Sequence, residues 1–507
     1  MSPWRITIFL LSVICLLAIL GAAIPKQGIT IGDALTLRFP SPAEVLFKQE
    51  EKKVDISDIL SVETDATATV ELDTISVDTL TADTVVEPFR FDPNALAPLE
   101  ERIALHYPDG DRSVLHPLFA ALVKANSGRK PIRIMHYGDS QLEGDRITSY
   151  LRNKLQTQFG GSGPGLVAIA DIVPSFSVER IVSDHWLRYS VMGRKDPTQH
   201  HARFGALSAF SRFTPILPDT VPPDTVVHTA SVTFKPLRRA YGKARVYDEC
   251  RLYFGWHRAP VTLELRNGTE IIATEVIAPA DKLLVREWRF PATPEELTLS
   301  FTGTDSPDVF GVSLEGRTGV CMDNIAARGG AGYEFRKADQ ALLRSMYEDL
   351  DVELLILQYG GNVLPNLKSA EEAAQYGRFF GAQIARFRKM IPGVSIIVIG
   401  PSDMSIKEGE DYVTRPYLED VRDALKANAL AQGAVFWDMY AAMGGRNSMV
   451  SWVEADPPLA ASDYTHFSPQ GARKVGELFY TALINDFAQY HANTKQEHGP
   501  KDEKNVP

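Results

Sequence analysis

The chain has 507 residues, of which 44% are hydrophobic and 23% are charged, a composition typical of a globular protein. Its formal net charge of −11 gives no support to nucleic-acid binding, because phosphates attract basic surfaces. The sequence contains no Walker loop, no zinc-finger spacing and no HExxH motif, so it gives no sign of the nucleotide or metal sites that these motifs build.

The first predicted element is an apolar helix at the N-terminus. Residues 6–24 contain no charged side chain, and a helix of that length can cross roughly 30 Å of hydrocarbon. Cleaved signal peptides usually have an apolar core of about 7–15 residues. We therefore predict that residues 1–25 are an uncleaved membrane anchor, with Arg5 in the cytoplasm and the rest of the chain on the periplasmic side. The alternative is a signal peptide cleaved near Ala22 and Ala23, which also exports the protein.

An acidic segment follows the apolar one. Residues 54–88 contain no Lys or Arg and are rich in Asp, Glu, Thr and Val. Polar and apolar residues alternate, but no turn-forming residues divide the segment into strands. We interpret residues 26–95 as an acidic, extended linker.

Two regions, residues 96–174 and residues 323–488, have the alternation of strands and helices that indicates a parallel α/β sheet. The region between them, residues 175–322, is rich in Val, Thr, Phe and Tyr in short alternating runs separated by turns such as Asn267-Gly268. This pattern predicts a β-sandwich inserted into one α/β domain. The tail, residues 489–507, is predicted to be disordered.

Two of the three cysteines lie in or beside the predicted sandwich. Cys250 and Cys321 are far apart in sequence and either pair in an oxidising compartment or remain free in the interior, whereas Cys15 falls in the apolar N-terminal run. No Cys-x-x-Cys occurs, so redox and metal sites are not indicated, and no cofactor is predicted.

Residues with catalytic chemistry occur in four predicted loops of the α/β domain. Ser140 follows Gly-Asp at the end of an apolar strand, Gly329 lies in a glycine-rich loop, and Asn362 follows Gly-Gly after another strand. Asp463 and His466 precede the final helix. Because loops beyond the carboxyl ends of parallel strands converge on one crevice, we expect these residues to meet there.

A serine in such a crevice can be a nucleophile. It needs a histidine to take its proton and a carboxylate to fix the tautomer of that histidine. Backbone N–H groups at a glycine corner and a side-chain amide such as Asn362 can stabilise the oxyanion. Each residue also has an ordinary structural interpretation: Asp139 or Ser140 can cap a helix, the glycines can be turns, and His466 can be a surface or core histidine. Their joint occurrence in an α/β frame favours catalysis.

The blocks GDS, loop Gly, GxN and DxxH resemble those of the SGNH/GDSL hydrolase superfamily. The insertion between the first two blocks, and the segments GVSLEGRTGVCMDNIAARGGAG and FWDMYAAMGGRNSMVSW, look like the peptidoglycan O-acetylesterase branch, which carries an inserted carbohydrate-binding-module-like sandwich. The resemblance covers residues 96–488. It implies a flavodoxin-like SGNH-hydrolase parallel sheet with helices on both faces, interrupted by a jelly-roll-like β-sandwich. Two positions depart from the pattern, Ala326 for a frequent glycine and Val363 for a frequent aspartate.

The same resemblance assigns roles. It implies that Ser140 is the nucleophile, His466 the general base and Asp463 its orienting partner. It further implies an oxyanion hole made of the N–H groups of Ser140 and Gly329 and the side chain of Asn362. No metal ligands are implied.

The leading functional hypothesis is a serine esterase that removes O-acetyl groups from a glycan outside the cytoplasm, with peptidoglycan as a candidate. An O-acetyltransferase would use the same triad, with a sugar hydroxyl in place of water, and would need an acetyl donor outside the cytoplasm. A non-catalytic glycan-binding protein is a third hypothesis, which the presence of the triad residues disfavours. Trp256 and Trp288 can stack on sugars, although tryptophans at strand spacing are more often core residues. The sugar, the acyl group, protein partners and the oligomeric state are not determined by the sequence.

Overall fold

The computed structural model describes residues 3–23, 29–31, 35–37, 54–61, 99–218, 220–223 and 225–498. The chain divides into two compact units, residues 1–54 and residues 55–507, which are described separately.

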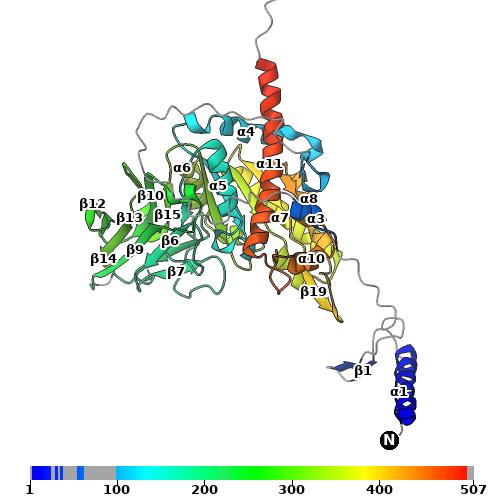
Figure 1. Ribbon diagram of the computed structural model, residues 1–507. Helices are drawn as coiled ribbons and strands as arrows, with labels where there is room; N and C mark the ends of the chain where they lie inside the picture. The colour runs from blue at the N-terminus through cyan, green and yellow to red at the C-terminus, as the bar shows by residue number, and fades with distance from the viewer. Residues whose placement is uncertain are drawn as a thin grey trace, which may run out of the picture. The chain divides into compact units, whose positions relative to one another are not determined.

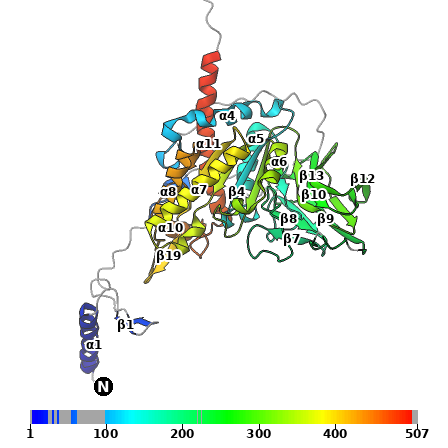
Figure 2. The ribbon, with the colours of Figure 1, turned by 180° about the vertical axis from the view of Figure 1, so that it is seen from behind.

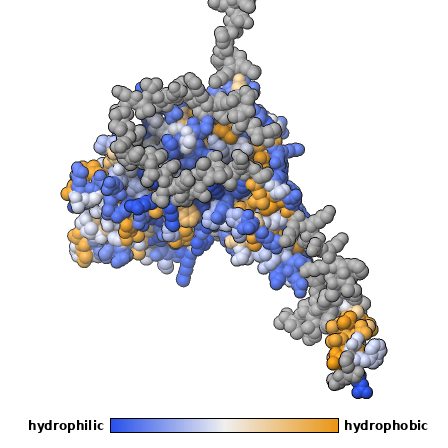
Figure 3. All heavy atoms as spheres, in the orientation of Figure 1, coloured by the Kyte–Doolittle hydropathy of each residue, from blue (hydrophilic) through white to orange (hydrophobic). Residues whose placement is uncertain are grey.

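The first unit contains the predicted apolar helix, α1 (Pro3–Ala23). Residues 4–21 have a mean hydropathy of 2.3 and are long and apolar enough to cross a membrane. Figure 3 shows the largely hydrophobic surface of this helix. An antiparallel pair, β1 (Ile29–Ile31) and β2 (Leu35–Leu37), follows it.

The range predicted as linker, residues 26–95, is described only in part. It includes the β1–β2 pair and, in the second unit, the short helix α3 (Ser57–Ser61), so it is not extended throughout. Most of the acidic segment, residues 54–88, lies outside the described residues.

A six-stranded sheet forms the centre of the α/β part (Figure 1). Five neighbouring strands are parallel, and an antiparallel strand forms one edge. The strands read as continuous apolar runs because both faces of the sheet are covered. In order across the sheet they are β16 (Val320–Ala326), β4 (Ile132–Gly138), β17 (Val352–Gln358), β18 (Ser395–Ile399), β21 (Val435–Trp437) and the edge strand β3 (Leu105–His106).

Helices cover both faces of this sheet, as the sequence predicts. One face, turned to the viewer in Figure 1, carries α5 (Thr148–Phe159) and α11 (Pro469–His498), with α4 (His116–Val123) packed against α11. The opposite face, seen in Figure 2, carries α6 (Gln340–Leu350), α7 (Ala370–Met390) and α8 (Leu418–Ala431).

The C-terminal helix is longer than predicted. The sequence predicts disorder from residue 489 to residue 507, but α11 continues through His498. The reason is tertiary packing: the ring of Tyr490 lies 4.8 Å from that of His116 and 5.7 Å from that of Phe119, measured between centroids. Residues 499–507 lie outside the described residues.

The inserted region forms two antiparallel sheets that face each other, with a shared core of aliphatic and aromatic side chains. The inner sheet, next to the α/β part, has the order β13 (Ala280–Arg289), β10 (Glu249–His257), β15 (Asp308–Glu315), β8 (Ala209–Arg212) and β7 (Leu187–Ser190), and β5 (Gly165–Val167) also pairs with β15. The outer sheet has the order β12 (Glu270–Ile277), β11 (Val261–Asn267), β14 (Leu297–Gly303), β9 (His228–Pro236) and β6 (Val178–Val182).

Strand pairing changes both predicted boundaries of the insert. The sequence places the sandwich at residues 175–322, but β5 already pairs with β15 of the sandwich. At the other end, β16 pairs with β4 in the six-stranded sheet, so residues 320–322 do not belong to the sandwich. An apolar strand does not reveal from its own residues which sheet it joins, and this explains the error.

The sandwich and the α/β part share a buried boundary. Every residue of β15 is buried, because the second face of the inner sheet packs against the α/β core. At this boundary Arg133 of β4 is 0% exposed and forms ion pairs with Glu315 of β15 and Asp323 of β16. The two parts therefore form one unit rather than a module on a tether.

The two cysteines and two tryptophans of the predicted insert lie at buried or partly buried positions. Cys250 and Cys321 are both buried and free, so they do not form a disulfide. Trp256 and Trp288 are partly buried against the two hydrophobic cores, which supports the core interpretation over sugar stacking.

Candidate active site

Ser140 lies where β4 ends and a 3-10 helix, η7 (Ser140–Asp145), begins. Asp139 caps this helix, since its Oδ1 accepts a hydrogen bond from the Gln141 N–H at 2.9 Å. Gly138 permits the sharp corner: a Cβ there would lie 2.7 Å from Leu142 Cδ1 and 3.0 Å from the Gln358 carbonyl oxygen. The Gly-Asp-Ser sequence thus places the serine at the carboxyl end of a central strand.

Three of the predicted site residues form a continuous hydrogen-bonded chain. Ser140 Oγ lies 2.9 Å from His466 Nε2, and His466 Nδ1 lies 2.7 Å from Asp463 Oδ2. This is the order of contacts that general-base activation of a serine requires. The second oxygen of Asp463 accepts from the N–H groups of His466 at 2.9 Å and Thr465 at 3.0 Å.

The hydrogen bonds to Asp463 keep it ionised. Partial burial opposes its charge, but the backbone N–H and imidazole of His466 and the Thr465 N–H outweigh burial and lower the pKa of Asp463. An ionised Asp463 holds the proton of the imidazole on Nδ1. Nε2 is then free to accept the proton of Ser140.

A hairpin supports the loop that carries the histidine. Its strands are β19 (Ser405–Glu408) and β20 (Asp411–Thr414). The Tyr412 ring stacks on that of Tyr464, with centroids 3.6 Å apart, and the Ser405 N–H donates to the Tyr464 carbonyl at 3.0 Å. Tyr464 has a φ of +53°, so these contacts hold the loop in a conformation that a tyrosine rarely adopts.

Neither this hairpin nor a role for Gln141 is predicted from the sequence. The side chain of Gln141 donates from Nε2 to the Thr465 carbonyl at 2.7 Å and so links the serine loop to the histidine loop. The position of Gln141 directly after the nucleophile is the signal that could have drawn attention to it.

Asn362 also reaches the site. It lies in the 3-10 helix η10 (Gly361–Asn366) that follows β17. Its Nδ2 donates to Asp139 Oδ2 at 3.1 Å and to the Gly330 carbonyl at 3.0 Å. The amide is therefore held beside the serine corner by two acceptors.

Gly329 borders the site through its neighbour Gly330. It is exposed, has a φ of +73°, and is not among the described residues that line the cavity at Ser140. Its neighbour Gly330 contacts Asn362 through its carbonyl oxygen. The role of the Gly329 N–H in an oxyanion hole stays a prediction.

Asp139 also belongs to the site. From the sequence it is predicted only as a possible helix cap. It is 6% exposed, and burial raises its pKa to about 6, against the opposing effect of the Gln141 N–H. Its location between the nucleophile corner and Asn362 makes it the residue that positions the candidate oxyanion donor.

A small cavity of about 90 Å³ opens beside Ser140. Ser140, His466 and Asn362 contribute to it, and its apolar wall comes from Tyr359, Pro401, Met404 and Met439. Pockets for drug-sized ligands are several times larger, roughly 300–1,000 Å³. The cavity has room for a short acyl group. Among the described residues, no group of three or more His, Cys, Asp or Glu could hold a metal ion.

No family model and no curated protein matches the chain. Among solved structures, a peptidoglycan O-acetylesterase superposes with a TM-score of 0.57 at 20% identity, covering 74% of this chain and 96% of that chain. An acetyl xylan esterase gives 0.26 at 13% identity, with 32% and 82% covered. A family two carbohydrate esterase from Cellvibrio japonicus gives 0.22 at 7% identity, with 62% and 99% covered.

The first of these likenesses shows the fold. The chain has the architecture of the solved peptidoglycan O-acetylesterase over nearly all of that protein's length, which confirms the fold expected from the SGNH/GDSL resemblance. The other two TM-scores are too low to support an argument.

Proposed function

We propose that this chain, which has the fold of a peptidoglycan O-acetylesterase, is a serine esterase that removes O-acetyl groups from a glycan outside the cytoplasm. The observation that carries the proposal is the chain of contacts from Ser140 Oγ to His466 and on to Asp463, at 2.9 and 2.7 Å. A protein that only binds glycans would not need these three side chains in this order of contacts, so the triad favours an enzyme.

The geometry supports a two-step reaction. His466 Nε2 takes the proton of Ser140 as Oγ attacks the acetyl carbonyl carbon, and the proton then passes to the leaving sugar oxygen. This step leaves an acetyl-serine and a free sugar hydroxyl. His466 next takes a proton from water, which attacks the acetyl carbonyl and releases acetate, and Ser140 regains its proton.

The developing oxyanion needs donors near Ser140. We assign this role to the Ser140 N–H, the Gly329 N–H and Asn362 Nδ2. Support for Asn362 comes from its place in the cavity of Ser140 and His466. That cavity, at about 90 Å³, favours acetyl over longer acyl groups.

The N-terminal helix supports a substrate outside the cytoplasm. A helix that can cross a membrane, as either an anchor or an export signal, would place the triad outside the cytoplasm. Glycans of the cell envelope are then within reach, and the fold likeness supports peptidoglycan as the first candidate. We further propose that the sandwich contributes to glycan binding.

Acetate release tests the proposal. We would compare O-acetylated peptidoglycan, acetylated xylan and a small aryl acetate, using wild type, Ser140→Ala and the control Ser127→Ala, which changes an exposed serine that does not line the small cavity. Ser140→Ala should reduce turnover by about 10³-fold or more, while the control stays unchanged. Turnover of Ser140→Ala within about tenfold of wild type would contradict the assignment. Transfer of acetyl to added glycan in place of acetate release would instead identify an O-acetyltransferase.

A further inference from the structure

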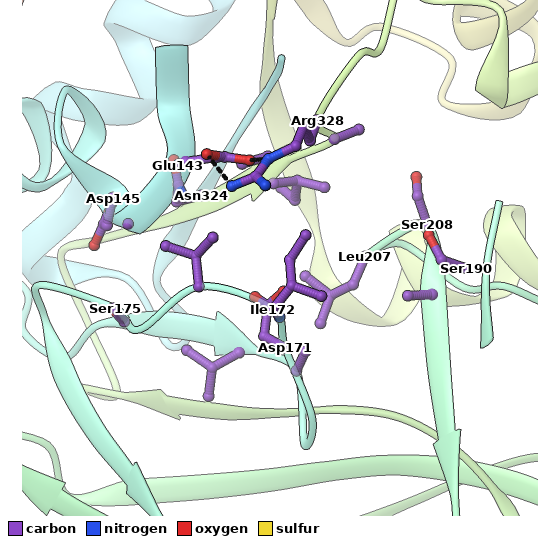
Figure 4. A pocket seen from close by; sticks show the side chains of 18 of the residues that line it. Glu143, Asp145, Asp171, Ile172, Ser175, Ser190, Leu207, Ser208, Asn324 and Arg328 are labelled. Atoms are coloured by element: carbon purple, nitrogen blue, oxygen red, sulfur yellow. Dashed lines mark hydrogen bonds and ion pairs between the residues drawn. The ribbon is translucent and has the colours of Figure 1, made fainter. Parts of the chain in front are cut away.

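A second, larger cavity of about 360 Å³ lies where the α/β part meets the sandwich (Figure 4). It begins beside the catalytic loops. Glu143, on the same 3-10 helix as Ser140, pairs at its rim with Arg328, which directly precedes Gly329. The opposite wall comes from the sandwich, including Asp171 and Ser208. One short segment therefore borders both cavities: Ser140 and Gln141 line the small one, and Glu143 and Gly144 line the larger one.

The lining of the larger cavity has a surplus of positive charge. It contains four arginines and three carboxylates, and two of the arginines are neutralised by close partners: Arg152 by Asp145, and Arg328 by Glu143. The remaining charged residues are Arg180, Arg188 and Asp171.

Arg180 and Arg188 lie on edge strands of the two facing sheets, β6 and β7. Asp171 forms an ion pair with Arg188 and acts on Arg180 only through its charge. Arg188 approaches Asp171 Oδ1 only to 3.8 Å, and its buried Nε has no hydrogen-bond partner among the described residues. Arg180 donates to the Ala168 carbonyl at 2.9 Å. Burial lowers the pKa of Arg180, Asp171 opposes that effect, and Arg188 adds to it.

An anion in this cavity would relieve the shortage of acceptors. A carboxylate accepts charge-assisted hydrogen bonds from guanidinium groups, and these are stronger than neutral ones. The rest of the lining suits a sugar, because it combines the hydroxyls of Ser190 and Ser208 with the aliphatic surfaces of Ile172 and Leu207 (Figure 4). The volume falls within the usual range of ligand sites, roughly 300–1,000 Å³.

We propose that this cavity is a substrate subsite that binds a carboxylate carried by the glycan, with Arg180 and Arg188 as the recognising side chains. The subsite rests on the proposed esterase function and specifies its substrate class: an acetylated glycan that bears a carboxylate near the acetyl group. The carboxylate belongs either to a sugar ring or to a peptide branch on the sugar.

Two substitutions with opposite expected effects test the subsite. Arg188→Gln removes a cation and should raise the KM for carboxylate-bearing glycans about tenfold, with kcat within about twofold. Asp171→Asn removes the competing anion and should lower that KM about threefold. Arg266→Gln is the matched control: Arg266 is a partly exposed, ion-paired arginine of the outer sheet that does not line the cavity.

The substrates separate the two sources of the carboxylate. Acetylated polygalacturonate carries it on the ring, whereas O-acetylated peptidoglycan with and without stem peptides tests the peptide branch. Acetylated xylan and an aryl acetate lack the group, and their KM should not change in any variant. An equal change for charged and neutral substrates, or a change of the same sign in both variants, would overturn the subsite.

A binding measurement with ligands that cannot be hydrolysed tests the subsite independently of the esterase proposal. Titration calorimetry with oligogalacturonates and with soluble stem-bearing muropeptides, both free of acetyl groups, measures the subsite directly. Loss of affinity in Arg188→Gln and a gain in Asp171→Asn would support the subsite even if no ester were cleaved. Hydrolysis of the aryl acetate together with unchanged binding of both ligands in the two variants would overturn the subsite and leave the esterase proposal intact.

Discussion

Asn362 Nδ2 donates hydrogen bonds to Asp139 Oδ2 at 3.1 Å and to the Gly330 carbonyl at 3.0 Å. Both amide hydrogens of Asn362 are thus engaged before any substrate is present. The amide is well positioned, but to serve an oxyanion it must exchange one acceptor for the new one. Asp139 directly precedes Ser140, so the Gly-Asp-Ser block also orients the candidate oxyanion donor.

The first prediction concerns Asn362→Ala. It should lower kcat by about 10²- to 10³-fold and change KM much less, because an oxyanion donor acts mainly in the transition state. Steady-state kinetics on an aryl acetate measures both constants. Asn366→Ala, an exposed asparagine on the same 3-10 helix, is the control. An effect on KM alone would make Asn362 a residue for ground-state binding.

The second prediction concerns stability and Asp139. Burial raises the pKa of Asp139 from 3.8 to about 6, so the folded state holds a proton that the unfolded chain loses between these values. Stability contributed by this group should therefore fall as pH rises from about 4 to about 6 and stay lower above. Relative to Asp139→Asn, wild type should lose about 2–3 kcal/mol of unfolding free energy between pH 4 and pH 8. Urea unfolding at both pH values checks this, and a constant difference would contradict it.

The same substitution should damage catalysis, which is the third prediction. An amide keeps the acceptor for the Gln141 N–H but places an NH₂ group where Asp139 Oδ2 accepts from Asn362. Two donors then face each other, and Asn362 must move. We expect kcat at pH 8 to fall by about 10-fold or more. Unchanged kcat would show that Asp139 does not position Asn362.

The fourth prediction concerns the boundary between the sandwich and the α/β part. Glu315→Ala leaves Arg133 buried with one carboxylate fewer and should lower the unfolding free energy by about 3–5 kcal/mol. Burial opposes the charge of Glu315, yet Arg133 and Ser313 lower its pKa, so the pair is ionised in the folded state. The control is Glu296→Ala, which breaks an exposed pair with Lys235 and should cost less than about 1 kcal/mol. Equal losses in the two variants would show that the buried network is not stabilising.

The sequence predicted the parts of the site whose geometry is local. Ser140 at the end of an apolar strand, and Asp463 three residues before His466, carry their arrangement in their own spacing, and the parallel sheet brings their loops together. The triad contacts therefore follow from short motifs combined with one topological rule.

The remaining features depend on contacts between distant segments. Tyr412 supports Tyr464, and the larger cavity is lined both by Glu143 and by the sandwich residue Asp171. Neither arrangement produces a periodic pattern in the sequence. The extension of α11 past residue 488 similarly depends on where Tyr490 meets α4. Such contacts appear only when the chain is folded.

The last prediction concerns the subcellular location of the protein, which limits the glycans it can reach. Residues 4–21 of α1 have a mean hydropathy of 2.3, and the segment is longer than the apolar core of a typical signal peptide. We expect the protein to stay in the membrane pellet after a carbonate wash, and protease added outside the inner membrane should cut the catalytic part. A variant lacking residues 1–25 fused to a cleavable export signal is the control and should be released. Recovery of the wild type as a soluble protein beginning near Ile24 would show cleavage and leave the esterase proposal standing. Recovery in the cytoplasm would exclude envelope glycans as substrates, because the protein could not reach them. Its target would then have to be an acetylated sugar inside the cell.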